Sequence, residues 1–351
     1  MNLDQNSFYP IELSLTRVKK RWGGWPGKIG EIWSLSCHPY ECIAINGFLS
    51  GFKLRELVGQ FQQKLLGSDM ELDPREPFPL LLRFISTTQD LPVQVHPDDR
   101  YTLKNGLDMV GRDKIFYIIN ARKNAKIYSG FVQKTNKDRI FKAVSEDSLL
   151  RLLNPLPVRP GEVYTIPARR IHSIGKGVVL LEIQRHSNLS FKFSLRPDSH
   201  PLNEAVKILD FNPTSPRSIQ QVSIVSGNNR IAWLAITPNF MLRKLVIRGS
   251  LDIALKGKRF VVYTGLRGMG RLRWGLSGKS VFIEPGQSIL IPAVREDLLF
   301  VSEEGFEVME TSVPDLSEET IEQFSGHGIK SDEIIGLGGN DYGQILKGCI
   351  C

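Results

Sequence analysis

The sequence is poor in cysteine and has no long hydrophobic run. Its 351 residues include four cysteines, at positions 37, 42, 349 and 351, and no two of them form a CxxC pair. This excludes a CxxC zinc or redox motif, and we expect reduced thiols. No segment approaches the roughly 20 apolar residues that a spanning helix needs, and the first residues lack an apolar signal core. The sequence therefore predicts a cytoplasmic protein without a transmembrane segment.

Positive charge is in excess, but it is not concentrated in one part of the chain. The 45 Lys and Arg residues exceed the 37 Asp and Glu residues, which gives a net charge of +8. Such a charge favours anionic partners. A nucleic-acid surface would require a basic stripe with interleaved aromatic residues, and the basic residues are scattered instead. We expect no nucleic-acid partner and a small phosphorylated ligand; the alternative is that most of these charges only solvate the surface.

Short apolar runs separated by turn residues dominate three parts of the chain, residues 78–132, 158–184 and 230–312. Many short strands at this spacing are typical of β-sandwiches and barrels. Apolar residues three and four apart occur in residues 53–66, which predicts an amphipathic helix. Similar helical spacing lies between the strand-rich parts. A chain of this length is long enough for two or three packed units, so we expect β cores with helices packed on them.

An internal repeat connects two of these parts. Residues 160–167 read PGEVYTIP and residues 285–292 read PGQSILIP, each a turn, an apolar strand and a proline. Glycine permits the tight turn, and proline ends a strand where no amide donor is needed. Five residues after the first copy stands His172, whereas Asp297 occupies that place after the second copy. We therefore expect two copies of one barrel hairpin, with chemistry in the first barrel and a structural role for the second.

Three polar residues are candidates for a metal or sugar site. Gln94 and His96 are two apart in LPVQVHPDD, so on a strand their side chains share one face. An imidazole and an amide oxygen can both ligate a divalent metal. His172 follows a predicted strand at a barrel mouth, where ligands usually bind. From spacing alone, metal or sugar binding and a hydrogen-bonded core role for these residues both remain open.

Several longer segments resemble one known family. FPLLLRFI, DLPVQVHPDD, GRDKIFYIINA and PGEVYTIPARRIHSIGKG, preceded by WGGWPGKIGEIWSLSCHP, resemble type I phosphomannose isomerases of the short bacterial form, in that order and spacing. The resemblance covers residues 15 to 312. It implies a mainly β tandem cupin fold, with two double-stranded β-helix (jelly-roll) barrels and interposed helices, and a zinc-dependent enzyme that interconverts mannose 6-phosphate and fructose 6-phosphate.

The resemblance, together with the strand-rich, helical and polar patterns, divides the chain into units. These are an N-terminal catalytic-type cupin, two helical segments, a C-terminal structural cupin and a polar tail with a short helix and a loose end. Their predicted residues are, in that order, 1–133 with 155–198, 134–154 with 199–220, 221–315 and 316–351.

By this resemblance, Gln94, His96 and His172 match three zinc ligands. The family's fourth ligand is a glutamate, and Lys114 stands at its position. An ammonium group near a divalent ion is repelled, and carboxylate neutralisation is lost. Asp113 is the possible substitute, because a one-residue bulge would exchange the faces of these two neighbours.

The resemblance assigns catalytic roles as well. Lys192 stands where the family has an arginine and keeps the charge without the planar guanidinium. Glu182 retains an acidic position and is the candidate general base for proton transfer through an enediol, with the metal polarising the carbonyl group. Arg169 and Arg170 are candidate phosphate contacts, the alternative being an exposed rim.

A second hypothesis comes from another class of protein. The chain would be a catalytically impaired cupin that binds a sugar phosphate or a partner protein, having lost its metal through Lys114. Zinc content and turnover separate the two hypotheses. The oligomeric state is not predicted.

Overall fold

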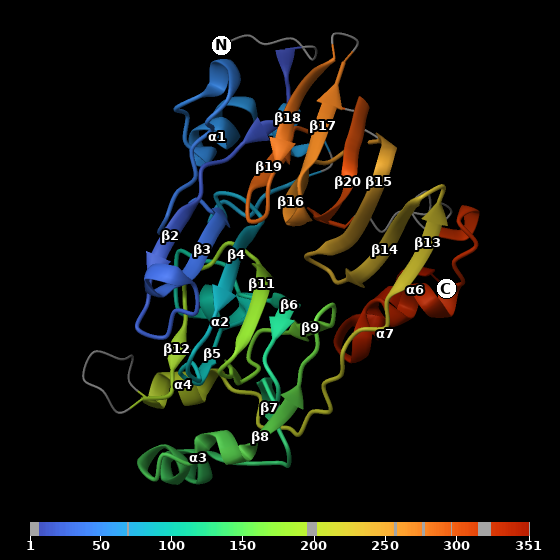
Figure 1. Cartoon of the computed structure of the whole chain (residues 1–351). Coiled ribbons are helices and arrows are strands. Elements are labelled where there is room, and N and C mark those ends of the chain that lie inside the picture. Colours follow the sequence, from blue (N-terminus) through green and yellow to red (C-terminus); the bar gives the residue numbers. More distant parts are fainter. Residues whose placement is uncertain are drawn as a thin grey trace.

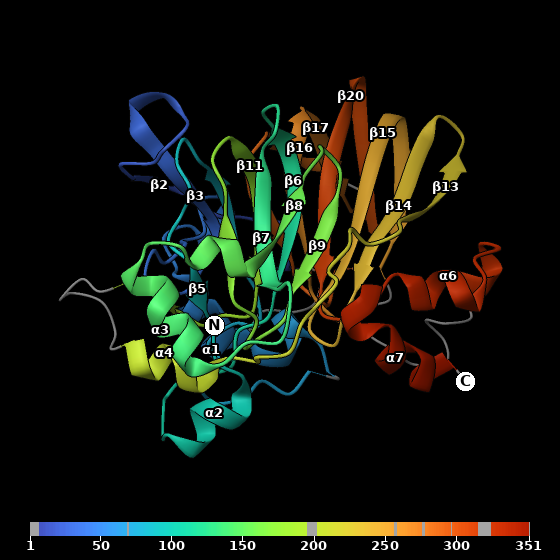
Figure 2. The same ribbon diagram turned by 90° about the horizontal axis from the view of Figure 1, so that it is seen from below.

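The chain folds into two β-barrels that lie side by side, with helices at their ends (Figure 1). Figure 2 shows that most strands of the two barrels have roughly aligned axes. Strands outnumber helices, as the short apolar runs predict. The computed structural model describes residues 7–68, 70–194, 202–255, 258–275, 278–295, 297–314 and 324–350.

The first barrel is built from two sheets whose neighbouring strands are antiparallel. In order, the six-stranded sheet contains β2 (Thr16–Lys19), β3 (Ile29–Leu35), β4 (Leu81–Ser86), β11 (Val178–Gln184), β6 (Lys114–Ala121) and β9 (Val163–Ile166). The five-stranded sheet contains β12 (Phe191–Lys192), β5 (Gln94–Val95), β10 (His172–Ile174), β7 (Lys126–Phe131) and β8 (Leu153–Pro157). Strands far apart in sequence thus alternate in space, which brings the predicted site residues together.

The second barrel is formed by a nine-stranded sheet. Its main path contains β1 (Ile11–Glu12), β19 (Ser288–Ile291), β16 (Val261–Gly268), β20 (Asp297–Ser312), β15 (Met241–Ala254), β14 (Asn229–Ile236) and β13 (Val222–Ser226), while β17 (Gly270–Trp274) pairs with β20 and with β18 (Lys279–Ile283). Strand β1 therefore joins the second barrel, although the sequence assigns residues 1–133 to the first. The domain boundaries themselves stay predictions.

Both barrels share one strand arrangement. The order β4-β11-β6-β9 in the first barrel corresponds to β15-β20-β16-β19 in the second. Strands β9 and β19 are the two predicted copies of the repeated hairpin. The turn glycines before them, Gly161 and Gly286, have φ values of 91° and 90°, a region that favours glycine. The predicted duplication is thus present in the backbone.

Four helices cover the first barrel and the junction, namely α1 (Leu54–Leu66), α2 (Asp99–Lys104), α3 (Lys137–Ser145) and α4 (Leu202–Ile208). On α1, Leu54, Leu57, Phe61 and Leu65 are buried in a cluster with residues of both barrels, as the helical spacing predicts. Helices α3 and α4 share a second cluster at one end of the first barrel. They fall in the predicted helical segments, of which residues 199–201 lie outside the described residues.

The end of the chain is helical, where the sequence predicts a loose tail. Helices α6 (Ser331–Gly336) and α7 (Gly339–Ile350) lie beside β13 and β14 (Figure 1). Ile334, Leu337 and Leu346 are buried against Trp233 of the second barrel. Burial of these widely spaced apolar residues stabilises the packing of an otherwise polar segment on the second barrel. The prediction of a loose end was therefore wrong for residues 324–350. Residues 315–323 lie outside the described residues.

Within the described part of the chain, every helix is too short or too polar to cross a bilayer. Cys37 and Cys42 are buried free thiols, as expected. Cys351 lies outside the described residues.

Candidate active site

A cavity of about 270 Å³ opens into the first barrel. We call it the first-barrel cavity. Its wall includes the aromatic side chains of Trp22, Trp33 and Tyr40. Its polar lining contains four cations, one carboxylate and one amide that matter for the chemistry below: Lys20, Arg83, Arg112, Lys192, Glu31 and Gln94. The excess of cations fits an anionic ligand.

Two histidines meet next to Gln94, which lines this cavity, although neither histidine is itself part of the lining. His172 begins β10 and pairs with Gln94 of β5, and His96 follows β5 directly. The two imidazole rings have centroids 5.0 Å apart, and both residues are almost fully buried. The proximity predicted from the sequence is therefore present.

Hydrogen bonds set the tautomer of both rings. Nδ1 of His96 lies 2.9 Å from the carbonyl oxygen of Leu189, and Nδ1 of His172 lies 2.9 Å from that of Arg170. A carbonyl oxygen only accepts, so each Nδ1 carries the proton in the neutral ring. Each Nε2 then has a lone pair. Both Nε2 atoms are buried and lack a hydrogen-bond partner among the described residues.

The two rings are held neutral. Burial and, next, the charge of Lys114 lower the pKa of His172 to about 3, and the same causes hold the pKa of His96 well below its ordinary value. A neutral imidazole with a backbone-bound Nδ1 is the form that ligates a metal. Gln94 Oε1 accepts a hydrogen bond of 2.8 Å from Ser190 Oγ and retains a second lone pair. These three side chains fit a divalent metal as donors.

Lys114, which stands at the position of the family's glutamate ligand, is fully buried. Its Nζ donates to Glu182 Oε2 over 2.9 Å, while Arg83 Nε donates to Glu182 Oε1 over 2.6 Å. Burial, with smaller contributions from Arg112 and Arg83, lowers the pKa of Lys114 although Glu182 opposes this. Among the described residues, no three His, Cys, Asp or Glu side chains gather in a metal-binding group. The possible metal donors His96, His172 and Gln94 are all neutral. The nearby carboxylate of Glu182 does not join them, because it is already bound by two cations.

Asp113 does not replace the missing carboxylate. Its Oδ1 accepts from Ala168 N and its Oδ2 from Asn239 Nδ2, each over 2.7 Å. The register of β6 against β11 is regular at Lys114 and shifts only near Val179. The bulge that would exchange the faces is therefore absent, and the hypothesis of Asp113 as a ligand was wrong.

Arg169 and Arg170 lie outside the lining of the first-barrel cavity. Arg170 forms a bidentate ion pair with Asp341 of α7, with distances of 2.7 and 2.8 Å. Arg169 donates to the carbonyl oxygen of Ile208 and lies 3.9 Å from Asp98. Arg170 thus joins the first barrel to the C-terminal helix, and its guanidinium is turned to a carboxylate instead of a phosphate.

The two predicted catalytic residues have different surroundings. Lys192 is exposed, lines the first-barrel cavity and pairs with Gln94 across β12 and β5. Glu182 is fully buried and does not line that cavity. Burial raises the pKa of Glu182, but Arg83, Lys114 and Arg112 together lower it below its ordinary value. Glu182 is therefore a weak proton acceptor.

Sequence reasoning missed Glu31, Arg83 and Arg112 as cavity residues. Glu31 is buried, accepts from Trp33 Nε1 over 3.0 Å and lies 3.5 Å from Lys20 Nζ. A usable signal was present in FPLLLRFI, where Arg83 interrupts an apolar strand. A charge in a buried strand requires a partner.

Sequence comparison finds curated relatives along most of the chain. A mannose-6-phosphate isomerase, ManA, of Bacillus subtilis is 32% identical over 76% of this chain and 84% of its own length. A mannose-6-phosphate isomerase of Streptococcus mutans is 27% identical over 81% of this chain and 92% of its own length. A scan of protein-family profiles finds no match.

Solved structures share the fold. The mannose 6-phosphate isomerase of Bacillus subtilis superposes with a TM-score of 0.75, covers 86% of this chain and 99% of its own, and is 24% identical. A zinc-bound mannose 6-phosphate isomerase superposes with a TM-score of 0.68, with 14% identity over 87% and 100% of the two chains. These superpositions confirm the predicted mainly β fold, which the chain shares with these isomerases.

Proposed function

Because the chain belongs to the mannose-6-phosphate isomerase family, we propose that the first-barrel cavity is its active site, where mannose 6-phosphate and fructose 6-phosphate are interconverted. The protein is an aldose-ketose isomerase. The observation that supports this location is the pair of buried, neutral histidines, His96 and His172, whose Nε2 lone pairs have no partner among the described residues.

Zinc is the cofactor that we propose, held by His96, His172 and Gln94. A bound zinc ion supplies Lewis-acid polarisation of a sugar oxygen. The backbone carbonyls behind the histidines orient both rings for this task. Since the donors are neutral and the ammonium of Lys114 is adjacent, we expect weaker zinc binding than in a site with a carboxylate ligand.

The cations of the cavity bind the anionic sugar. Lys192 and Lys20 hold the phosphate, because both line the cavity and neither is fully buried. Arg112 stabilises negative charge that develops on the enediolate. Its Nε and Nη2 donate to the neutral Gln184, so this contact leaves its charge uncancelled. Trp33 supplies an apolar wall for the sugar ring.

Glu31 is the residue to which we assign proton transfer. It is the only carboxylate among the described residues that line the cavity, and Lys20 Nζ and Arg83 Nη1 each lie 3.5 Å from its oxygens. Glu182 is instead fully buried outside this lining, where Lys114 and Arg83 donate to it over 2.9 and 2.6 Å. The carboxylate of Glu31 accepts the proton from C2 of the open-chain aldose and returns it to C1, while O1 gains a proton and O2 loses one. Glu182 acts by positioning Arg83 and Lys114.

The experiment that tests this proposal combines turnover with metal analysis. Wild type, His172→Gln and Glu31→Gln are assayed with mannose 6-phosphate in a coupled assay, with Arg169→Gln as a control outside the cavity. We expect about one zinc per active wild-type chain, loss of zinc and turnover in His172→Gln, and loss of turnover with retained zinc in Glu31→Gln.

A folded, zinc-free wild type without turnover would instead support the catalytically impaired cupin. A cytoplasmic location remains a prediction of the sequence.

A further inference from the structure

The second barrel repeats the charged centre of the first at matching positions. In the first barrel, Glu182 of β11 pairs with Arg83 of β4 and with Phe116 of β6. In the second, Glu310 of β20 pairs with Arg243 of β15 and with Tyr263 of β16. Because the strand orders also correspond, Glu310 and Arg243 stand where Glu182 and Arg83 stand.

The side chains repeat the same contacts. Arg243 Nε and Nη2 donate to the two oxygens of Glu310 over 2.6 and 2.8 Å. The guanidinium of Arg243 lies 5.8 Å from the ring of Trp233, as that of Arg83 lies 5.0 Å from the ring of Trp33. Each tryptophan pairs with its arginine across neighbouring strands. A row of Trp, Arg and Glu thus recurs in the second barrel.

A second arginine recurs as well, but its partner is different. Arg112 precedes β6 by two residues, and Arg259 precedes β16 by two residues. In the first barrel Arg112 binds the long side chain of Gln184. The matching position in the second barrel is Ser312, two residues after Glu310 as Gln184 follows Glu182. Serine is shorter, so the space that the amide fills in the first barrel is open in the second.

The structure shows two unsatisfied polar atoms beside this space. Ser312 Oγ and Arg259 Nε are both buried without a hydrogen-bond partner among the described residues, and Ser312 is only 5% exposed. Arg259 Nη1 donates to the neutral carbonyl oxygen of Pro314. Two buried polar atoms in one place are costly unless a ligand or solvent satisfies them.

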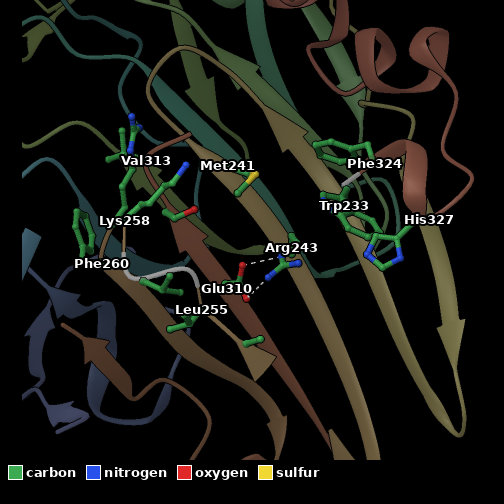
Figure 3. A pocket seen from close by; sticks show the side chains of 14 residues that line it. Trp233, Met241, Arg243, Leu255, Lys258, Phe260, Glu310, Val313, Phe324 and His327 are labelled. Carbon is green, nitrogen blue, oxygen red and sulfur yellow. Dashed lines mark hydrogen bonds and ion pairs between the residues drawn. The ribbon is translucent and has the colours of Figure 1, made fainter. Parts of the chain in front are cut away.

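These atoms line a cavity of about 160 Å³, which we call the second-barrel cavity. Figure 3 shows Arg243 and Glu310 near its centre, between Trp233 and His327 on one side and Lys258 on the other. Arg243 and Tyr263 together bind both oxygens of Glu310. The carboxylate is therefore already neutralised, and Arg259, which donates to a neutral carbonyl oxygen, adds positive charge to the lining.

The geometry points to a second ligand site in this cavity, which binds a phosphoryl group through Arg259 and Ser312. Arginine and serine donate hydrogen bonds to phosphate oxygens, and the positive charge of Arg259 is opposite to that of a phosphoryl group. The volume is smaller than that of the first-barrel cavity, 160 against 270 Å³, so the phosphoryl group fills it and any sugar projects from the mouth.

This second site binds without catalysing. In the first barrel Gln94 pairs with His172, whereas the matching pair in the second barrel is Ala254 with Asp297. The imidazole and amide donors of the first barrel are thus replaced by a methyl group and a carboxylate. Occupancy of the second-barrel cavity is therefore a binding event separate from turnover.

The test is a calorimetric titration of the full chain with inorganic phosphate and, in a separate arm, with fructose 6-phosphate. Wild type is compared with Arg259→Gln and Ser312→Val, while the coupled isomerase assay monitors the first barrel. We expect both variants to weaken one class of phosphate site at least tenfold and to keep turnover within twofold. Arg112→Gln, the matched change in the first barrel, should lower turnover and leave that site intact.

The two arms identify the source of the phosphoryl group. If inorganic phosphate and fructose 6-phosphate compete for the site that Arg259→Gln removes, the site takes the shared phosphoryl group; if only one binds there, that one is the ligand. Unphosphorylated fructose should not bind. Equal phosphate affinity and stoichiometry in wild type and Ser312→Val would overturn the proposal, and Ser312→Val tests it even if Arg259→Gln fails to fold.

Discussion

The ammonium nitrogen of Lys114 lies 2.9 Å from Oε2 of Glu182, and both side chains are fully buried. Arg83 binds the other oxygen of the same carboxylate, so two cations share one anion in the interior of the first barrel. In the second barrel, the corresponding carboxylate of Glu310 is shared by Arg243 and the neutral Tyr263. The first barrel thus carries one more buried positive charge, next to the histidines.

Removing the shared carboxylate should cost more stability than removing one of its cations. Glu182→Gln leaves Arg83 and Lys114 buried without a counter-charge, and we expect a loss of about 3–5 kcal/mol in the free energy of unfolding. Lys114→Met leaves Glu182 paired with Arg83 and should lose clearly less. Urea unfolding of both variants measures the difference, and a greater loss in Lys114→Met would contradict this account of the triad.

Lys114→Glu should increase the affinity for zinc. The substitution removes the repelling ammonium and places a second carboxylate beside Glu182, and a bound zinc ion would relieve the repulsion between the two. We expect the variant to be less stable than wild type without metal and to gain more thermal stability on zinc addition. Lys114→Gln serves as the control without a charge. Identical zinc dependence of the melting temperature in the glutamate and glutamine variants would contradict the prediction.

Arg170 should matter for stability and not for substrate binding. Its bidentate pair with Asp341 is largely buried, so Arg170→Gln should lower the free energy of unfolding by about 1.5–3 kcal/mol. The KM for mannose 6-phosphate should stay within twofold. Asp341→Asn is the matched change on α7, and a double-mutant cycle should show coupling. A KM that rises tenfold in Arg170→Gln but not in Asp341→Asn would restore the phosphate role.

Lys192 should show the opposite behaviour. It is exposed at the mouth of the first-barrel cavity, so Lys192→Gln should leave the melting temperature within about 1 °C of wild type. We expect kcat/KM to fall by about 10²-fold, since the positive charge that Lys192 places beside the anionic substrate is lost. Lys192→Arg keeps the charge and should retain most activity. Unchanged kinetics in Lys192→Gln would remove this residue from the site.

Acid should destabilise the protein through His186. Burial, with smaller effects of neighbouring cationic groups, lowers the pKa of His186 to about 4, and its Nε2 accepts from the backbone N of Cys37. Between about pH 6.5 and 4 the unfolded chain binds a proton that the folded chain does not, so stability is complete above this window and falls as the pH falls. The loss from this group reaches about 2 kcal/mol at pH 5.

The measurement is chemical unfolding at pH 7 and pH 5. His186→Gln keeps an acceptor for Cys37 N without a titratable ring, and the difference between the two pH values should shrink in that variant. The same difference in wild type and variant would show that His186 does not carry the effect.

Local patterns in the sequence were sufficient to predict the strands, the repeated hairpin and helix α1. Alternation places Gln94 and His96 on one face of β5, and turn glycines mark equivalent corners in both barrels. These features depend on neighbours along the chain, which is why they can be read without a structure. The convergence of His96 and His172 followed from the family resemblance and is present.

What the sequence by itself determined is therefore the two-barrel fold and the pair of histidines in the first barrel. Only the tertiary structure decided the partners of charged groups: Lys114 with Glu182, Asp113 with Asn239, and Arg170 with Asp341. Each pair joins segments 68 to 171 residues apart. A buried charge must find a partner, but which one it finds depends on strand register and helix docking, and neither is encoded locally.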